Sequence, residues 1–282
     1  PNTGGLLSGI QGALTITGTG NDTLNLDDTG SLAGVNNTGV MASTNSSSTL
    51  DGINMGTVDG THSITYTGLA QLNLNLGAAN YKRAITGTYR HPVGSVVTTV
   101  NAGSLILLGN GAITGSAVIQ VAASAILDAT GRSDKTLSVG TGQTLTGDGT
   151  LNGNVDVNAG AILAPGTSIG TLAFGTNLTL NGGSTTVMAI NKSTTPSNDV
   201  AQVAGELNYG GTLVITNLEA MPFAAGDSFK LFNAAKYNGT FTNIMPAIPG
   251  INLAWDTDGL TNGMLRVVSQ PTPSPEFGAL KL

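Results

Sequence analysis

The residues best suited to acid–base chemistry lie between positions 128 and 135, where Asp128, Arg132, Asp134 and Lys135 share one short polar stretch. Two carboxylates beside a cation form a set that glycoside hydrolases use to cleave sugar chains. The same four residues also make a self-contained ion-paired loop that needs no substrate. We favour the ion-paired loop and predict no catalytic residue, with a polysaccharide-active enzyme as the least favoured alternative.

Calcium is the metal that the sequence suggests most readily. Gly20-Asn-Asp22 is similar to part of the repeat G-G-x-G-x-D-x-U-x, in which oxygens from neighbouring turns surround a calcium ion. Asp27 and Asp28 follow and add two carboxylates, but the motif occurs once and lacks the first pair of glycines. Asp22, Asp27 and Asp28 are candidate calcium ligands, solvated turn carboxylates are the favoured interpretation, and no other cofactor is expected.

Aromatic and basic residues gather in one segment, Tyr81-Lys-Arg-Ala-Ile-Thr-Gly-Thr-Tyr-Arg-His91. Aromatic rings stack on other flat groups, and arginine pairs with carboxylates, so the segment is suited to an acidic polysaccharide. Tyr81, Arg83 and Tyr89 are the candidate glycan-binding residues. The alternative is an irregular connection between two β-units. Neither His62 nor His91 has a candidate catalytic partner nearby in the sequence.

Charge and composition narrow the class of protein. Asp and Glu outnumber Lys and Arg by 16 to 10, so the net charge is −6, and a nucleic-acid partner is not expected because phosphate binding needs a basic surface. Charged residues make up only 9%, against roughly 25% in an average soluble domain. No apolar run has the 18 or so residues that predict a transmembrane helix. Thr, Asn and Gly supply the polarity instead, which favours strands and tight turns.

Apolar residues occur in short alternating runs such as Leu72-Asn-Leu-Asn-Leu76 and Val155-Asp-Val157, which indicate strands. From about Gly103 these runs repeat: Val121 aligns with Val157, 36 residues on, with one further run between them. The spacing predicts coils of about 18–20 residues in a right-handed parallel β-helix, an all-β solenoid. Stacked turn asparagines are expected to form hydrogen-bonded ladders.

We divide the chain into four parts. Residues 1–102 form an irregular β region, residues 103–197 carry the solenoid repeats, and residues 270–282 are a Pro-rich linker. Residues 198–269 hold most of the aromatic residues and predict a C-terminal antiparallel β cap. Its expected strands are Gly211–Leu218, Ser228–Phe232, Gly239–Ile244, Asn252–Asp256 and Met264–Ser269.

The repeat region resembles the bacterial autotransporter-associated β-strand repeat family. The resemblance is carried by Leu145-Thr-Gly-Asp-Gly-Thr-Leu-Asn-Gly and by the turn Leu163-Ala-Pro-Gly-Thr-Ser-Ile-Gly-Thr-Leu172. It covers about residues 103 to 268 and includes Ala225-Gly-Asp-Ser-Phe-Lys-Leu-Phe232. The resemblance implies a secreted β-solenoid on the bacterial cell surface, and it implies no chemistry, because the family is defined by its scaffold.

The expected function is that of a non-enzymatic extracellular structural protein, such as a fibre or stalk subunit. An uncapped solenoid end presents unpaired strand edges, so self-association is expected. An adhesin or carbohydrate-binding module is the main alternative, with an extracellular polysaccharide as its partner.

Overall fold

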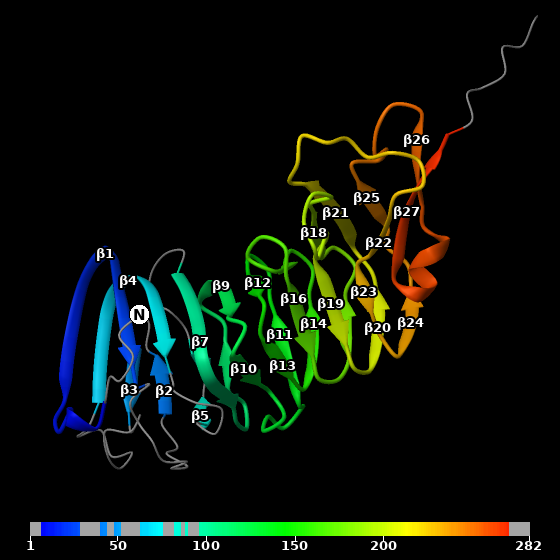
Figure 1. Ribbon diagram of the computed structural model, residues 1–282. Helices are drawn as coiled ribbons and strands as arrows, with labels where there is room; N and C mark the ends of the chain where they lie inside the picture. The colour runs from blue at the N-terminus through cyan, green and yellow to red at the C-terminus, as the bar shows by residue number, and fades with distance from the viewer. Residues whose placement is uncertain are drawn as a thin grey trace, which may run out of the picture.

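The chain folds into a rod of short strands stacked side by side (Figure 1). The structure is a computed structural model that describes residues 7–28, 40–43, 48–51, 63–75, 82–85, 88–89 and 96–270. From β9 to β25, with β22 as the exception, the coil visits three faces in a fixed order, and each strand pairs in parallel with same-face strands of adjacent coils. The protein is all-β with long parallel sheets, an arrangement consistent with a β-solenoid.

Face 1 is the longest face and begins at β1. Its strands follow one another in parallel, with the antiparallel hairpin of β2 and β3 beside β4. The strands are β1 (Leu14–Asp27), β2 (Val40–Ser43), β3 (Ser48–Asp51), β4 (Ser63–Asn75), β7 (Val96–Leu107), β9 (Ser116–Val121), β12 (Thr144–Gly147), β15 (Ile162–Pro165), β18 (Thr185–Ile190), β21 (Thr212–Asn217) and β25 (Asn243–Met245).

Faces 2 and 3 are formed by shorter strands, and the second half of β7 belongs to face 2. Face 2 continues with β5 (Lys82–Ile85), β10 (Ala125–Asp128), β13 (Thr150–Asn152), β16 (Thr171–Phe174), β19 (Val200–Val203) and β23 (Phe232–Asn233). Face 3 comprises β11 (Thr136–Val139), β14 (Asn154–Val157), β17 (Leu178–Leu180), β20 (Glu206–Tyr209) and β24 (Lys236–Gly239).

The remaining elements lie beside or beyond these faces. A two-stranded parallel sheet joins β6 (Thr88–Tyr89) to β8 (Ala112–Ile113). An antiparallel sheet contains β22 (Ser228–Lys230), β27 (Met264–Ser269) and β26 (Leu253–Asp256). Two 3-10 helices are present, η1 (Leu7–Gly9) and η2 (Asp258–Asn262). The described residues include no helix with the length and apolarity that a membrane crossing requires.

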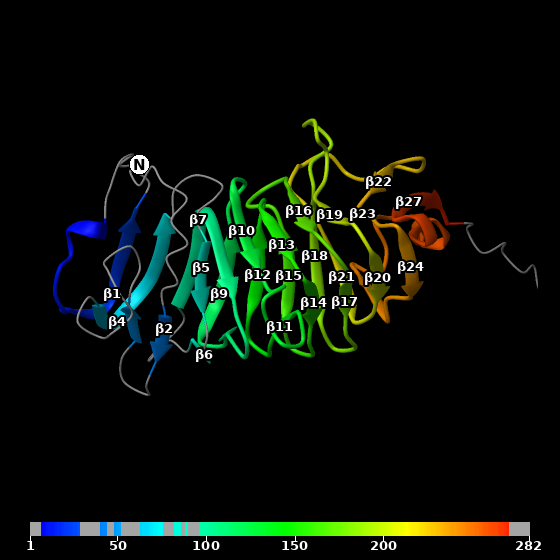
Figure 2. The same cartoon turned by 90° about the horizontal axis from the view of Figure 1, so that it is seen from below.

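Figure 2 shows the strands of successive coils stacked along the rod. The core consists of apolar columns that run along it, one set for each face. Successive side chains of a strand point to opposite sides, so alternate residues point inward and stack on their equivalents in the next coil. Those residues are fully buried in the columns Ile119–Leu145–Leu163, Leu127–Leu151–Phe174 and Leu137–Val155–Leu178. A single coil has no partner for these side chains, so stacking provides the core.

The predicted coil length holds for some neighbouring strands and not for others. Thr144 and its neighbour Ile162 are 18 residues apart, and so are Thr136 and Asn154 on face 3, whereas Thr212 and its neighbour Asn243 are 31 residues apart. The alignment of Val121 with Val157 is wrong, because Val121 belongs to β9 in face 1 and Val157 to β14 in face 3. Turns lie at the surface, where insertions are tolerated, so the coils differ in length while their inward columns stay in register.

The antiparallel region is smaller than predicted. The segments Gly211–Leu218 and Gly239–Ile244 contain β21 and β25, which pair in parallel, and β19, β20, β23 and β24 also continue the three faces. Alternation marks which side chains point inward, but it does not distinguish parallel from antiparallel neighbours. Only β22, β26 and β27 form the antiparallel sheet.

Candidate functional site

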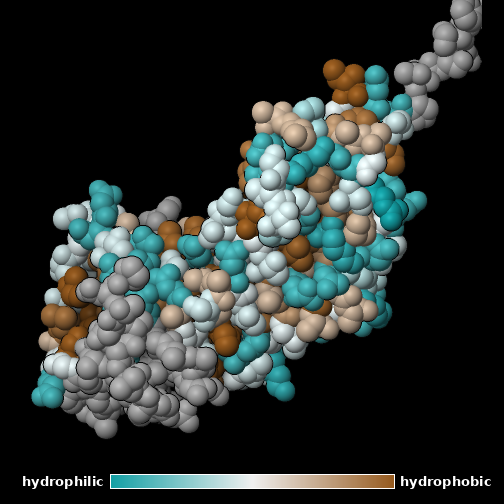
Figure 3. Space-filling model, viewed as in Figure 1, coloured by the Kyte–Doolittle hydropathy of each residue, from teal (hydrophilic) through white to brown (hydrophobic). Residues whose placement is uncertain are grey.

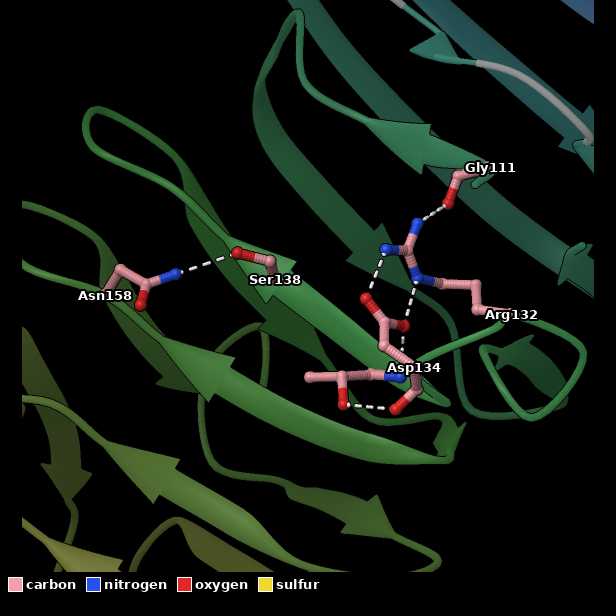
Figure 4. Close-up of polar contacts among 6 residues, drawn as sticks. Gly111, Arg132, Asp134, Ser138 and Asn158 are labelled. Atoms are coloured by element: carbon pink, nitrogen blue, oxygen red, sulfur yellow. Dashed lines mark hydrogen bonds and ion pairs between the residues drawn. The ribbon is translucent and has the colours of Figure 1, made fainter. Parts of the chain in front are cut away.

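The loop between β10 and β11 holds the charged residues that sequence analysis singled out (Figure 4). The guanidinium of Arg132 donates two hydrogen bonds to the Asp134 carboxylate, Nε to Oδ1 at 2.8 Å and Nη2 to Oδ2 at 2.7 Å. Asp128 Oδ1 accepts hydrogen bonds from the backbone N–H and hydroxyl of Thr130. Of the predicted ion-paired loop, the structure shows the pair of Arg132 with Asp134, whereas Asp128 is the last residue of β10 and bonds to Thr130 instead.

Arg132 also ties two coils together. Its Nη1 donates to the Gly111 carbonyl oxygen of the preceding coil, and Arg132 itself forms an isolated parallel bridge with Gly109. The hydrogen bonds from Arg132 hold the pKa of Asp134 at about 2, below its usual value. This arrangement fastens a turn and keeps Asp134 ionised, so it is suited to holding structure.

A hollow of about 170 Å³ lies next to this loop, between β8 and β11. Here β8 has only two residues, whereas β11 in the following coil has four. Gln143 lines the hollow, and its Nε2 donates to the carbonyl oxygens of Ile113 and Ser116, both at 2.9 Å. The remaining space is lined by apolar groups and by hydroxyls, and Arg132 at its edge is already bonded.

The calcium candidates do not converge. Asp22 accepts hydrogen bonds from the backbone N–H and hydroxyl of Thr19, and these bonds lower its pKa. Asp28 is fully buried and accepts a hydrogen bond from the Leu7 backbone N–H at 3.0 Å, which fastens the N-terminal segment. Six residues of extended chain separate Asp22 from Asp28, roughly 20 Å. Among the described residues, no group of three or more potential metal-binding side chains gathers in one place.

The glycan candidates fall outside what the structure describes in atomic detail. Tyr81 is not among the described residues. The backbones of Arg83 and Tyr89 belong to β5 and β6, and their side chains are not described. Their role in glycan binding stays a prediction.

Comparison with known proteins does not indicate a function for this chain. No known protein family matches this sequence, and no curated protein is significantly similar to it. The resemblance described above therefore stays a prediction.

A buried carboxylate, Asp199, was not predicted from the sequence. It is 2% exposed, and its oxygens accept hydrogen bonds from the backbone N–H groups of Gly170 (3.0 Å) and Ala189 (2.7 Å). Burial, with a smaller contribution from the nearby Asp148, raises its pKa to about 6 against the lowering effect of the two hydrogen bonds. Asp199 thus connects the turn after β15 to β18, two segments that meet only because the coils stack.

Aromatic side chains gather at the C-terminal end of the rod. Tyr209 contacts Phe241, Phe232 and Tyr237, with ring centroids 4.9, 5.2 and 6.1 Å away. A second hollow of about 170 Å³ opens beside these rings. The sequence predicted aromatic packing in this region, but the hollow depends on the approach of η2, which no local pattern reveals.

Proposed function

We propose that the chain is a secreted, non-enzymatic structural segment of a bacterial surface protein, and that copies of it join end to end. The observation that carries this proposal is the uninterrupted parallel stack of face 1, from β1 at one end of the described chain to β25 at the other. Every neighbour along that main stack runs in the same direction, so a second copy placed further along the axis continues the same pattern.

The strand edges at the two ends support end-to-end joining. Among the described strands, β1 pairs only with β4 and β25 only with β21, so each has one edge with unpaired backbone groups. Such edges recruit further strands. Joining β25 of one copy to β1 of the next is a head-to-tail contact, which produces an open filament rather than a closed ring.

The outer surface supports a structural role. On face 3, hydrogen bonds between coils link turn and strand side chains: Asn181 to Asn158 (3.2 Å), Asn208 to Thr179 (3.4 Å) and Asn238 to Asn208 (3.0 Å). On face 1, none of the eight parallel strands from β4 to β25 contains a charged residue. Bonds of this kind stiffen a rod against bending, and the uncharged face lacks the repulsion that keeps copies apart.

The proposal includes a right-handed coil and a partial cap. Parallel crossovers between strands of one sheet are right-handed in about 98% of cases. The antiparallel sheet and η2 act as the cap of faces 2 and 3, because the backbone N–H groups of Leu231 and Phe232 donate to the Gly263 carbonyl oxygen. The cap leaves the β25 edge of face 1 open.

Exposed apolar residues are concentrated near that open edge. Figure 3 shows hydrophobic side chains at the tip of the C-terminal lobe, which comprises residues 218–230 and 246–270. In and beside this lobe, six large apolar side chains are more than a third exposed: Leu218, Met221, Met245, Ile248, Ile251 and Val268. Clusters of this kind mark contacts with a protein or another surface.

Negative-stain electron microscopy across a concentration series tests the proposal. We expect filaments that persist on dilution, and the Met245→Lys variant, which puts a charge on the β25 edge, is expected to raise the concentration for half-assembly at least tenfold. Ala123→Lys is the matched control, because Ala123 is exposed and lies in the turn between β9 and β10, away from both ends and from the apolar cluster. Uniform single rods at every concentration would contradict end-to-end joining.

A further inference from the structure

The hollow at the C-terminal end of the rod has the features of a small binding site. It lies between the last coil, which contributes Tyr237 to Ile244, and η2 with its preceding residue Thr257. Its volume of about 170 Å³ leaves room for one small ring. Sites of this kind combine apolar walls with a few polar groups that fix the orientation of the ligand.

One wall of the hollow consists of aromatic rings, and backbone groups fix the two tyrosine rings through hydrogen bonds with their hydroxyls. The Tyr209 hydroxyl donates to the Leu260 carbonyl oxygen at 3.1 Å, and the Tyr237 hydroxyl accepts a hydrogen bond from the Ala234 N–H at 2.9 Å. Tyr209 is 8% exposed and packs against Phe241, whose ring is partly exposed. The rings are therefore fixed before a ligand arrives, which reduces the ordering that binding requires.

The rest of the lining is polar but uncharged. It includes Thr240 of the last coil, Thr257, and Thr261 of η2, whose hydroxyl donates to the Asp258 carbonyl oxygen at 2.7 Å. None of the ten lining residues is acidic or basic. Lys230 Nζ lies over the Tyr237 ring, 5.9 Å from its centroid, and donates a hydrogen bond to the Asn262 carbonyl oxygen. An ionic ligand finds no counter-charge in the hollow, so a neutral ligand is favoured.

A sugar ring matches both sides. The face of an aromatic ring carries negative charge density, which attracts the weakly positive C–H groups on one face of a pyranose. The hydroxyls of the same sugar supply donors and acceptors for threonine side chains. We propose that this hollow, lined by Tyr209, Tyr237, Phe241 and the three threonines, binds one residue of a neutral glycan. The proposal does not require that the chain assembles.

Titration of the full chain with three neutral trisaccharides, cellotriose, maltotriose and triacetylchitotriose, tests the site by calorimetry and saturation-transfer NMR. We expect at least one to bind with a dissociation constant on the order of 1 mM, which is usual for a contact limited to one ring. Saturation transfer is expected to be strongest at the C–H protons of one sugar face. The anionic trisaccharide of galacturonic acid is expected not to bind.

Variants identify the site. Phe241→Leu keeps an apolar side chain but removes the ring, and is expected to weaken binding at least fivefold. Phe223→Leu is the matched control, because it removes a ring from the separate cluster of Phe223, Phe229 and Trp255. Should Phe241→Leu fail to fold by circular dichroism, Thr257→Val at an exposed rim position is expected to weaken binding about threefold, the loss of part of one hydrogen bond.

Two results would overturn the proposal. One is that none of the three neutral trisaccharides shows saturable binding when its concentration is raised to about twenty times the expected dissociation constant. The other is binding that neither Phe241→Leu nor Thr257→Val changes. Either result leaves the electron-microscopy test of filament formation unaffected, so failure of this site is distinguishable from failure of the structural function.

Discussion

Asp199 makes the stability of the rod depend on pH between about 4 and 6. Its folded pKa is raised from 3.8 to about 6 by burial. The folded state therefore binds this proton more tightly than the unfolded state. The stabilisation is complete below pH 3.8 and is lost as the pH rises through 6. A difference of roughly two pKa units corresponds to about 3 kcal/mol in the free energy of unfolding.

The Asp199→Asn variant isolates this contribution. Asparagine cannot ionise and has one acceptor oxygen, so one of the two N–H groups, of Gly170 or of Ala189, loses its partner. The variant is expected to lose about 1–3 kcal/mol of stability at low pH. The difference in free energy of unfolding between wild type and variant is expected to shrink by up to about 3 kcal/mol from pH 4 to pH 7.

Guanidinium unfolding followed by circular dichroism at several pH values measures this difference. The titration of Asp134, whose pKa is held at about 2 by Arg132, is the same in both proteins and cancels. Asp148→Asn is the second control: it removes a charge that raises the pKa of Asp199, so the transition should move to lower pH. Unfolding profiles that stay parallel from pH 4 to pH 7 would refute this reasoning.

Three further substitutions probe the stack itself, each measured by the same unfolding assay. Gly147→Ala should destabilise the fold by more than about 2 kcal/mol. Gly147 has a φ of 116°, and a Cβ there would lie 2.1 Å from the Val121 carbonyl oxygen. A loss below half that value would contradict this close approach of the two backbones. Phe174→Ala should cost about 3–5 kcal/mol, since Phe174 fills the face 2 column; a loss under 1 kcal/mol would mean a loosely packed core. Thr186→Val should stabilise by about 1 kcal/mol, because the fully buried Thr186 hydroxyl has no hydrogen-bond partner; destabilisation would show that the hydroxyl is bonded.

Local features of the fold could be read from the sequence. Alternation correctly identified a strand at Val155-Asp-Val157, where Val155 and Val157 are buried, because period-2 burial follows from strand geometry alone. The expected asparagine ladder is confirmed at Asn158 and Asn181. The ion pair of Arg132 with Asp134 was also foreseen, since the two residues lie two positions apart.

The stacking of the coils could not be predicted in the same way. Alternation does not say which strand lies next to which, and coil lengths change by insertion in surface turns. For the same reason Asp199 was missed: its partners Gly170 and Ala189 are 29 and 10 residues away. The aromatic hollow likewise depends on η2 meeting Tyr209, 51 residues earlier in the chain than Leu260.

X-ray diffraction from aligned assemblies of the purified protein tests the central claim most directly. Strands of a solenoid lie about 4.7–4.9 Å apart along the rod axis. If copies join end to end through β25 and β1, the filaments should give a strong reflection near 4.8 Å along the fibre axis. Failure to form filaments, or a reflection of that spacing perpendicular to the fibre axis, would contradict the proposed head-to-tail assembly.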